Sequence, residues 1–353
     1  MGGTRVRGAR AVAPSDEVPA LPASWRPLLA PYGRPSTVHS LVQLVTTAAL
    51  FVVGWWAMLH TLRVSYWLTL LVALLEGGLL IRLFIMFHDC VHGSFFRSQA
   101  ANDFVGRILG VVTLTPYRYW RRNHLLHHAT SGNLDRRGYG DVDTLTVKEY
   151  QALSAWGRAC YRFSRNPLVY LVVGPPYLFL LKHRLPIGMP LSWRKEWGSI
   201  LWNNLAIAAV ILAMSNAVGF RTFVSIQMPV FLVSTIAGIW LFYVQHQFGG
   251  TYWRREDRWD FTEACMAGSS LLEVPRPLRW ATASIEIHHI HHLCSAIPNY
   301  RLRRCMEEVE GLPEPRRLSL WQSFRCARLS LWDEREERLI GFRHLRAKQA
   351  ISA

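Results

Sequence analysis

The chain has 353 residues, of which half are hydrophobic, and it carries 15 tryptophans and a formal net charge of +16. Nucleic-acid-binding proteins can be this basic, but here the charges lie outside long apolar runs and no nucleic-acid module is recognisable, which excludes a nucleic-acid partner and favours a membrane protein. The six cysteines are scattered without a CxxC pair, which predicts reduced thiols facing a cytosol.

The first segment, residues 1–37, is rich in Ala, Pro, Gly and Arg and has no apolar run of the kind found in signal peptides. It is predicted to be a flexible cytosolic arm. Four apolar runs follow, at about 40–60, 64–87, 199–220 and 223–244, and each approaches the ~20 residues that a helix needs to cross a bilayer. The links within the first and second pair are very short, so each pair is predicted to be a helical hairpin.

Charge sets the expected orientation of these spans. The short turns hold only Arg63 and Arg221, whereas the long segments carry most of the other basic residues. The positive-inside rule then places both termini and the central segment in the cytoplasm. The predicted fold class is an all-α integral membrane protein, with four transmembrane helices in two hairpins and a helical cytoplasmic cap. A membrane domain is expected over residues 38–310, followed by a charged cytosolic tail over 311–353.

Several segments outside the spans have their own patterns. Residues 104–116 and 167–181 are apolar but short, and are predicted to lie at the membrane interface. Thr146 and Glu149 form a capping box that predicts a helix as far as about Ser164. The tail from Leu318 onward has the charge pattern of a solvated amphipathic helix.

Three histidine clusters have helical spacing. The first, second and third clusters, which we call histidine boxes, are His88 and His92; His124, His127 and His128; and His288, His291 and His292. Residues three or four apart share one face of a helix, and neutral imidazole binds iron, copper, zinc and nickel alike. Eight ligands are too many for one tetrahedral zinc, so the clusters predict two metal ions. In the predicted topology all three clusters, and His246 at the end of the fourth span, lie on the cytoplasmic side.

The order HxxxH, HxxHH, HxxHH on this topology resembles that of the membrane fatty-acid desaturases, in the context of the bacterial acyl-lipid desaturases of the Δ12 kind. The similarity runs from about residue 40 to 310. Further matching stretches are Gly93-Ser94-Phe95-Phe96, Thr113-Leu114-Thr115-Pro116-Tyr117, Trp120-Arg121, Gly132-Asn133-Leu134-Asp135, Tyr243-Val244-Gln245-His246-Gln247-Phe248 and Ile297-Pro298-Asn299-Tyr300.

The resemblance implies a non-haem di-iron centre that uses O2 to desaturate a fatty-acyl chain, carried by a membrane lipid. Both termini and the active site would face the cytoplasm of a bacterial inner membrane. The implied ligands are His88, His92, His124, His127, His128, His288, His291 and His292, with His246 as a ninth. Electrons would come from an external carrier such as ferredoxin. The basic face either docks this acidic partner or only reflects membrane orientation.

Metal-bound histidines usually donate their second ring nitrogen to a carboxylate or carbonyl. Asp89, Asp135 and Asp141 are the candidates for this role, although Asp135 and Asp141 have neighbouring arginines as alternative partners. Asn299 either holds the segment after the third box or forms a turn beside Pro298. His289 is left out of the ligand set only by the motif pattern.

Some features depart from the pattern or stand alone. Glu286 occupies a position where related chains have glycine, and its ExxH spacing to His289 is interpreted as chance. Glu76 lies in the second span, where we expect a structural partner such as Asn203 or Asn204 in preference to a role in an acyl tunnel. Cysteines near the boxes, Cys90 and Cys294, are expected to be packed fillers and not ligands.

Two other functions remain open at this point. A related di-iron hydroxylase or carotenoid ketolase would share the metal chemistry and differ in product, which would gain oxygen where a desaturase product loses two hydrogens. A metal transporter would place its ligands near the middle of the membrane on broken helices, whereas these histidines lie at span ends and in the cytoplasmic segments.

Overall fold

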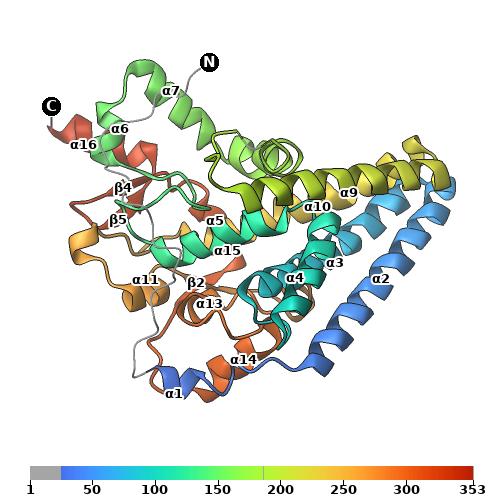
Figure 1. Ribbon diagram of the computed structural model, residues 1–353. Coiled ribbons are helices and arrows are strands. Elements are labelled where there is room, and N and C mark those ends of the chain that lie inside the picture. Colours follow the sequence, from blue (N-terminus) through green and yellow to red (C-terminus); the bar gives the residue numbers. More distant parts are fainter. Residues whose placement is uncertain (1–24, 186, 353) are drawn as a thin grey trace.

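The computed structural model describes residues 25–185 and 187–352, and most of them are helical. Four helices are long and apolar enough to cross a membrane: α2 (Thr37–Val64), α3 (Tyr66–His92), α9 (Arg194–Val218) and α10 (Phe220–His246). They extend together from one side of the remaining structure (Figure 1). The predicted four-span helical membrane class is confirmed, and we call the other described residues, 25–36, 93–185, 187–193 and 247–352, the cap.

Each hairpin turns on a single residue. Ser65 is extended between α2 and α3, whereas Gly219 between α9 and α10 has a φ of +88°, in a region that favours glycine. Helices α3 and α10 form the centre of the bundle. Half of the apolar window of α3 is buried, compared with 11% of that of α9, so α9 presents most of its surface to lipid.

The cap is helical with two small sheets that were not predicted. Its helices are α1 (Arg26–Leu29), α4 (Gln99–Val112), α5 (Tyr117–Thr130), α6 (Val147–Ala152), α7 (Ala155–Ser164), α8 (Gly174–Tyr177), the 3₁₀ turn η3 (Glu256–Arg258), α11 (Phe261–Ala267), α12 (Arg276–Thr282), α13 (His288–Leu293), α14 (Asn299–Glu308), α15 (Leu320–Cys326) and α16 (Phe342–Ser352). The strands are β1 (Leu145–Thr146), β2 (Ser270–Glu273), β3 (Arg316–Ser319), β4 (Leu331–Asp333) and β5 (Arg338–Ile340).

The C-terminal segment is not the solvated helix that its charge pattern predicted. Strand β3 pairs in parallel with β2, and β4 pairs with both β1 and β5. Trp332 of β4 is buried and packs with Leu134 and Trp253 from earlier parts of the chain. The charged residues 334–337 form the turn between β4 and β5. The prediction failed because β3 and β4 pair with β2 and β1, which lie in distant segments.

Two other local predictions need correction. The capping box at Thr146 is present, but the helix that it opens ends at Ala152, and Ser154 caps a second helix by accepting a hydrogen bond from Gly157 N–H at 3.1 Å. The end of the expected flexible arm packs on the cap, because Leu29 is fully buried and the Tyr32 hydroxyl donates to Glu308. Residues 1–24 of that arm lie outside the described residues.

The apolar segment 167–181 folds as two π-helical turns, η1 (Val169–Val173) and η2 (Leu178–Lys182), on either side of α8. Pro175 and Pro176 in α8 have no N–H to donate, which accounts for the irregular helical hydrogen bonding here. The segment 104–116 falls within and after α4, an amphipathic helix whose Phe104 and Ile108 are exposed.

Glu76 does not have the partners expected from the sequence. Both Asn203 and Asn204 accept hydrogen bonds from the Arg184 guanidinium, at 2.6 and 2.9 Å. The Glu76 side chain instead fills the space opposite Gly54 of α2, where a Cβ would lie 1.8 Å from the Glu76 Oε1 atom. Glu76 therefore lies at the contact between α2 and α3.

The short helix α13 lies at the centre of the cap. All six of its residues are buried, and Ile290 and Leu293 pack in one cluster with Val244, in the last turn of α10, and Phe248, just after it. Because α13 consists mostly of histidine, burial on every side requires that its polar rings have partners inside the protein.

Candidate metal centre

Nine histidines come together at the cap end of the spans. His88 and His92 lie in the last two turns of α3, and His246 is the last residue of α10. The other six are in two short cap helices: His124, His127 and His128 in α5, and His288, His291 and His292 in α13. Their ring nitrogens form two groups, and within each group the atoms lie within 4.8 Å of one another.

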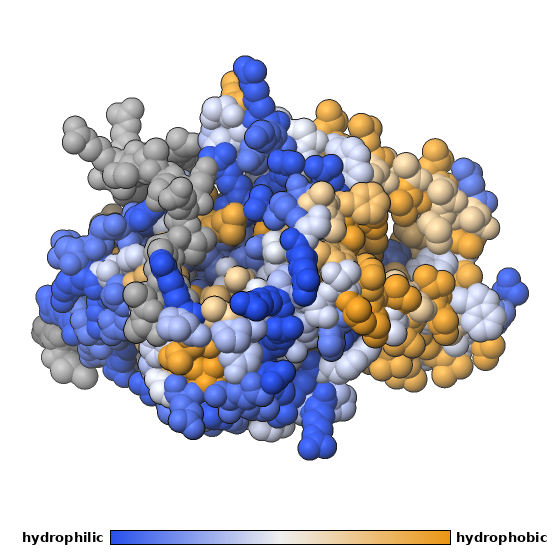
Figure 2. All heavy atoms as spheres, turned by 60° about the horizontal axis from the view of Figure 1, so that its bottom comes forward, coloured by the Kyte–Doolittle hydropathy of each residue, from blue (hydrophilic) through white to orange (hydrophobic). Residues whose placement is uncertain are grey.

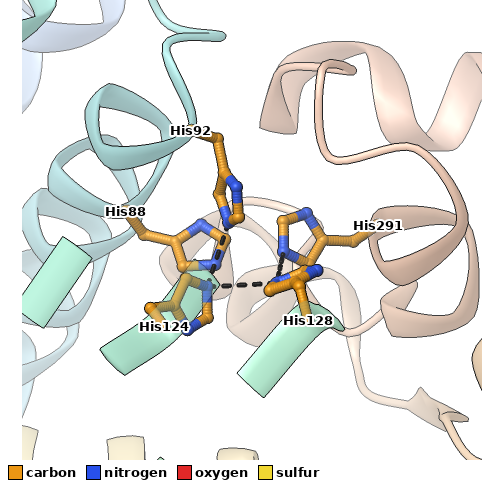
Figure 3. Close-up of side chains that lie close together, drawn as sticks. All are labelled: His88, His92, His124, His128 and His291. Carbon is orange, nitrogen blue, oxygen red and sulfur yellow. Dashed lines mark hydrogen bonds between the residues drawn. The ribbon is translucent and has the colours of Figure 1, made fainter. Parts of the chain in front are cut away.

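The first histidine group consists of His88, His92, His124, His128 and His291. Figure 3 shows the five rings turned toward a common centre from three helices. Their Nε2 atoms form a chain of close contacts, with 3.0 Å between His92 and His124, 3.1 Å between His124 and His128, and 3.1 Å between His128 and His291. The ring centroids of His88 and His291 are 4.5 Å apart.

The second histidine group consists of His127, His246, His288 and His292, and all four are buried. The Nε2 atom of His246 lies 3.2 Å from that of His127 and 2.9 Å from that of His288. The Nε2 atoms of His288 and His292 are 3.1 Å apart. This group therefore joins the end of the fourth span to both cap helices.

Helix geometry explains how each box is divided. Residues four apart stay on one face, so His124 and His128 belong to the first group, and His288 and His292 to the second. One step along a helix turns a side chain by about 100°, so His127, next to His128, joins the second group and His291, next to His292, joins the first. The three-residue spacing from His124 to His127 and from His288 to His291 does not keep these rings in one group. The groups touch, since the rings of His128 and His292 stack with centroids 4.1 Å apart.

The donor set fits metal cations. In each close Nε2 pair one ring must donate and the other accept, yet the Nε2 atom of His124 has such a contact with both His92 and His128. A neutral ring has one proton for its two nitrogens, so these contacts compete. A cation would accept the converging lone pairs together, and nitrogen-rich sites of this kind suit transition metals.

Burial keeps these rings in the ligand form. Desolvation lowers the pKa of His124, His128, His288, His291 and His292 well below the ordinary value, and the neighbouring imidazoles lower it further. A neutral imidazole has the free lone pair that a metal ion requires. The histidine groups are therefore ready to bind metal at neutral pH.

The three aspartates predicted to accept hydrogen bonds from ligand histidines differ in their contacts. The Asp141 carboxylate lies 2.5 Å from Nδ1 of His127, as expected of a residue that orients a ligand. Asp89 lies 3.5 Å from Nδ1 of His88, which is an ion-pair distance without hydrogen-bond geometry. The Asp135 carboxylate accepts from Arg255 and from the Glu256 N–H on the cap surface, an arginine and a backbone group of the kind expected as its alternative partners.

Asn299 connects the third box to the first. Its backbone N–H and its Nδ2 both donate to the Asp89 carboxylate, at 2.7 and 2.8 Å. Gln43 of α2, which the sequence analysis did not single out, donates to the Asn299 side chain at 2.8 Å. A buried glutamine in a span is a signal that could have revealed it, since polar groups there need partners.

Aromatic rings also hold the histidines. Trp120 stacks on His124 with centroids 4.2 Å apart, and Phe242 lies 5.5 Å from His127 and 5.3 Å from His246. Trp120 belongs to the resemblance quoted above, and its spacing of four residues from His124 on α5 is the signal that could have indicated this contact.

The doubtful residues near the boxes lie outside both histidine groups. His289 is buried, and burial lowers its pKa to about 4, but it belongs to neither group. Glu286 accepts from Thr282 at 2.7 Å and pairs with Arg303 at 3.1 Å, so its spacing to His289 has no metal-binding counterpart. Among the described residues, Cys90 and Cys294 also belong to neither group.

Comparisons with known proteins agree with this geometry. The family model for fatty acid desaturases matches residues 64–324. A Bacillus subtilis protein named fatty acid desaturase is 40% identical over 318 residues, covering 90% of each chain. A Synechocystis protein named sn-1 acyl-lipid omega-3 desaturase (ferredoxin) is 30% identical over 82% of this chain and 81% of its own. A Picosynechococcus sn-1 oleoyl-lipid 12-desaturase is 25% identical over 76% of this chain and 75% of its own.

Proposed function

Because the chain belongs to the fatty acid desaturase family, we propose that it introduces a double bond into the acyl chain of a membrane lipid at a histidine-bound di-iron centre. The observation that carries this proposal is the pair of histidine groups at one end of four membrane spans. The lipid-linked substrate is supported by relatives named as acyl-lipid and oleoyl-lipid desaturases. Because these relatives are named as omega-3 and 12-desaturases, we expect the double bond in the half of the acyl chain nearer its methyl end.

The two groups would each hold one iron. His88, His92, His124, His128 and His291 would hold the first, and His127, His246, His288 and His292 the second. Such a centre supplies the oxidising power that an unactivated methylene requires, since no side-chain base can remove its protons. The overall reaction consumes O2, two external electrons and two protons, removes two hydrogens from neighbouring carbons and releases two waters.

The protein contributes ring orientation and exclusion of water. Asp141 accepts from Nδ1 of His127, so that ring presents Nε2 to the centre. The contacts from Gln43 through Asn299 to Asp89 tie α2, α14 and α3 together beside His88. Because the rings are buried, water is kept out of the site, and this limits competing side reactions.

The electrons would come from a ferredoxin on the cytoplasmic side of a bacterial inner membrane. Two relatives carry ferredoxin in their names, and the positive-inside pattern supports a cytoplasmic cap. A basic cap would attract an acidic carrier, and that attraction weakens with added salt. A turnover rate that does not change with ionic strength would argue against electrostatic docking.

Expression in a host without polyunsaturated lipids tests the proposal. We expect lipids that have lost two hydrogens, with the new double bond at one position, and no product in cells that express His127→Ala. A product that has gained oxygen would support a hydroxylase or ketolase instead. Metal uptake into vesicles, without lipid products, would support a transporter.

A further inference from the structure

A basic cleft lies between α5 and the start of α9, outside both histidine groups. It has a volume of about 190 Å³ and is lined by Arg118, Arg121, Arg122, Leu125, Leu126 and Glu196. The lining thus combines three arginines with one glutamate and two leucines. From the sequence, basic residues such as these either dock an acidic electron carrier or reflect membrane orientation.

The carboxylates near this cleft do not fully neutralise it. Arg121 forms no ion pair among the described residues, and its Nε donates to the Val91 carbonyl at 2.9 Å. Arg118 lies 3.6 Å from Asp103, and its side chain is 37% exposed. Arg122 lies 3.5 Å from Glu196. The cleft therefore has a positive excess that suits an anion.

The cleft lies where the spans meet the cap. Val91 is in the last turn of α3, and the Arg118 N–H donates to the Ser199 hydroxyl in the second turn of α9 at 3.0 Å. Trp193, just before α9, lies against Arg122 with the guanidinium 4.0 Å from the ring centroid. Tryptophan in this position is typical of a membrane interface, at the depth of lipid headgroups. Figure 2 shows a hydrophilic part of the surface on one side of the molecule and a hydrophobic part on the other.

The same helix connects the cleft to the metal centre. Arg121 precedes His124 by one turn of α5, and Trp120 beside it stacks on His124. Arg121 lies on the side of α5 that carries His124 and His128, three and seven residues later, and its Nε donates to the carbonyl of Val91, the residue before His92. A lipid with its headgroup in the cleft would keep its acyl chain beside the same helix.

We propose that this cleft binds the phosphate of the substrate headgroup, so that the preferred substrate is a phospholipid. This inference rests on the proposed function and adds the headgroup class to it. Arginine presents planar donors that match phosphate oxygens, whereas a neutral sugar headgroup offers no charge to pair with them. The apolar floor at Leu125 and Leu126 suits the glycerol and ester region that follows the phosphate.

A competition experiment in reconstituted vesicles tests the proposal. Vesicles hold equal amounts of phosphatidylglycerol and monogalactosyl diacylglycerol with the same acyl chains, with ferredoxin, its reductase and NADPH present. The ratio of double bonds in the two lipid pools is then measured for the wild type, Arg118→Gln and Arg121→Gln. Arg107→Gln is the matched control, because Arg107 is an exposed arginine of the neighbouring α4 outside the cleft. Native mass spectrometry measures the ratio of the two lipids retained by each variant.

We expect the wild type and Arg107→Gln to favour phosphatidylglycerol, and each cleft variant to lose on the order of 10-fold of that preference in both readouts. A ratio is insensitive to partial loss of folded protein. Unchanged ratios in both cleft variants would overturn the proposal, as would a preference for acyl-coenzyme A over phospholipid in a third vesicle set, which would assign the phosphate to that carrier. If no lipid gains a double bond, the proposed function fails. The ratio of lipids retained in native mass spectrometry still tests whether the cleft binds phosphate.

Discussion

At the scale of single residues, the centre depends on the assignment of particular rings to particular groups. His127 belongs to the second histidine group and His291 to the first, although each has a neighbour in the other group. His289 lies between matched positions of the third box and is buried, yet it belongs to neither. This difference makes His289 a matched control for the ligands.

Replacement of His127 or His291 by alanine is expected to abolish double-bond formation and to lower the iron content, while the protein remains in the membrane. His289→Ala is expected to keep its iron, because no metal ligand is removed. Product analysis by gas chromatography and metal analysis of purified protein measure both effects. Retained turnover in His127→Ala would contradict its assignment as a ligand.

Asp141 makes a charge-assisted contact with His127 that Asp135 does not make with any histidine among its described contacts. Asp141→Asn is therefore expected to weaken metal binding about 10- to 100-fold, the range found for outer-shell partners of metal ligands. Asp135→Asn, on the cap surface, is the control and is expected to bind iron as the wild type does. Equal affinities in the two variants, measured by chelator competition, would exclude an orienting role for Asp141.

At the scale of elements, the contact of Glu76 with Gly54 joins the first hairpin. A methyl group at residue 54 would overlap Glu76, so Gly54→Ala is expected to destabilise the contact between α2 and α3 by about 1–3 kcal/mol. The additional change Glu76→Ala should restore most of that loss by removing the overlap. Gly238→Ala in α10 is the control, since a Cβ there meets nothing within 4 Å.

Thermal inactivation midpoints of the purified variants measure this coupling. A Gly54→Ala protein as stable as the wild type, or a double variant that is no more stable than Gly54→Ala, would show that the two side chains do not meet. Normal activity and yield in Glu76→Leu would further limit Glu76 to packing.

Sequence patterns predicted the elements that are determined by residues close together in the chain. Apolar run length predicted the four spans, and helical spacing predicted that His88 and His92 act together. In the C-terminal segment, β3 and β4 were missed because β2 and β1, with which they pair, lie more than 40 residues away in the chain. The partners of Asn203 and Asn204 were missed for the same reason, since Arg184 reaches them only in the folded protein.

The metal centre itself was partly predictable. The boxes supplied its residues, but the division of α5 and α13 between two groups depends on how two short helices face each other. Gln43 reaches the centre only through tertiary contacts that no spacing rule describes, whereas Trp120 lies four residues before His124 on α5 and helical spacing could have indicated its contact.

At the scale of the whole molecule, the buried histidines couple stability to pH. Burial holds the pKa of five cap histidines well below the unfolded value of about 6.5 and that of His289 at about 4. The unfolded chain therefore binds more protons as the pH falls below about 6.5, and the folded state loses stability. Each such histidine contributes about 1.4 kcal/mol per pH unit.

The metal-free protein is thus expected to have a lower Tm at about pH 5.5 than at about pH 7.5, with the full contribution of these histidines present above pH 6.5. Differential scanning calorimetry in a mild detergent measures this shift. A Tm that stays constant over the interval would show that the rings are not buried in the neutral form.

Metal stoichiometry tests the central claim most directly, because the account requires that nine histidines from α3, α5, α10 and α13 hold two irons together. Protein purified from iron-supplemented cells is analysed by inductively coupled plasma mass spectrometry and by Mössbauer spectroscopy. We predict two tightly bound irons per chain, with the spectrum of a nitrogen-ligated pair. A single metal, or loosely held zinc in a preparation that forms double bonds, would contradict the account.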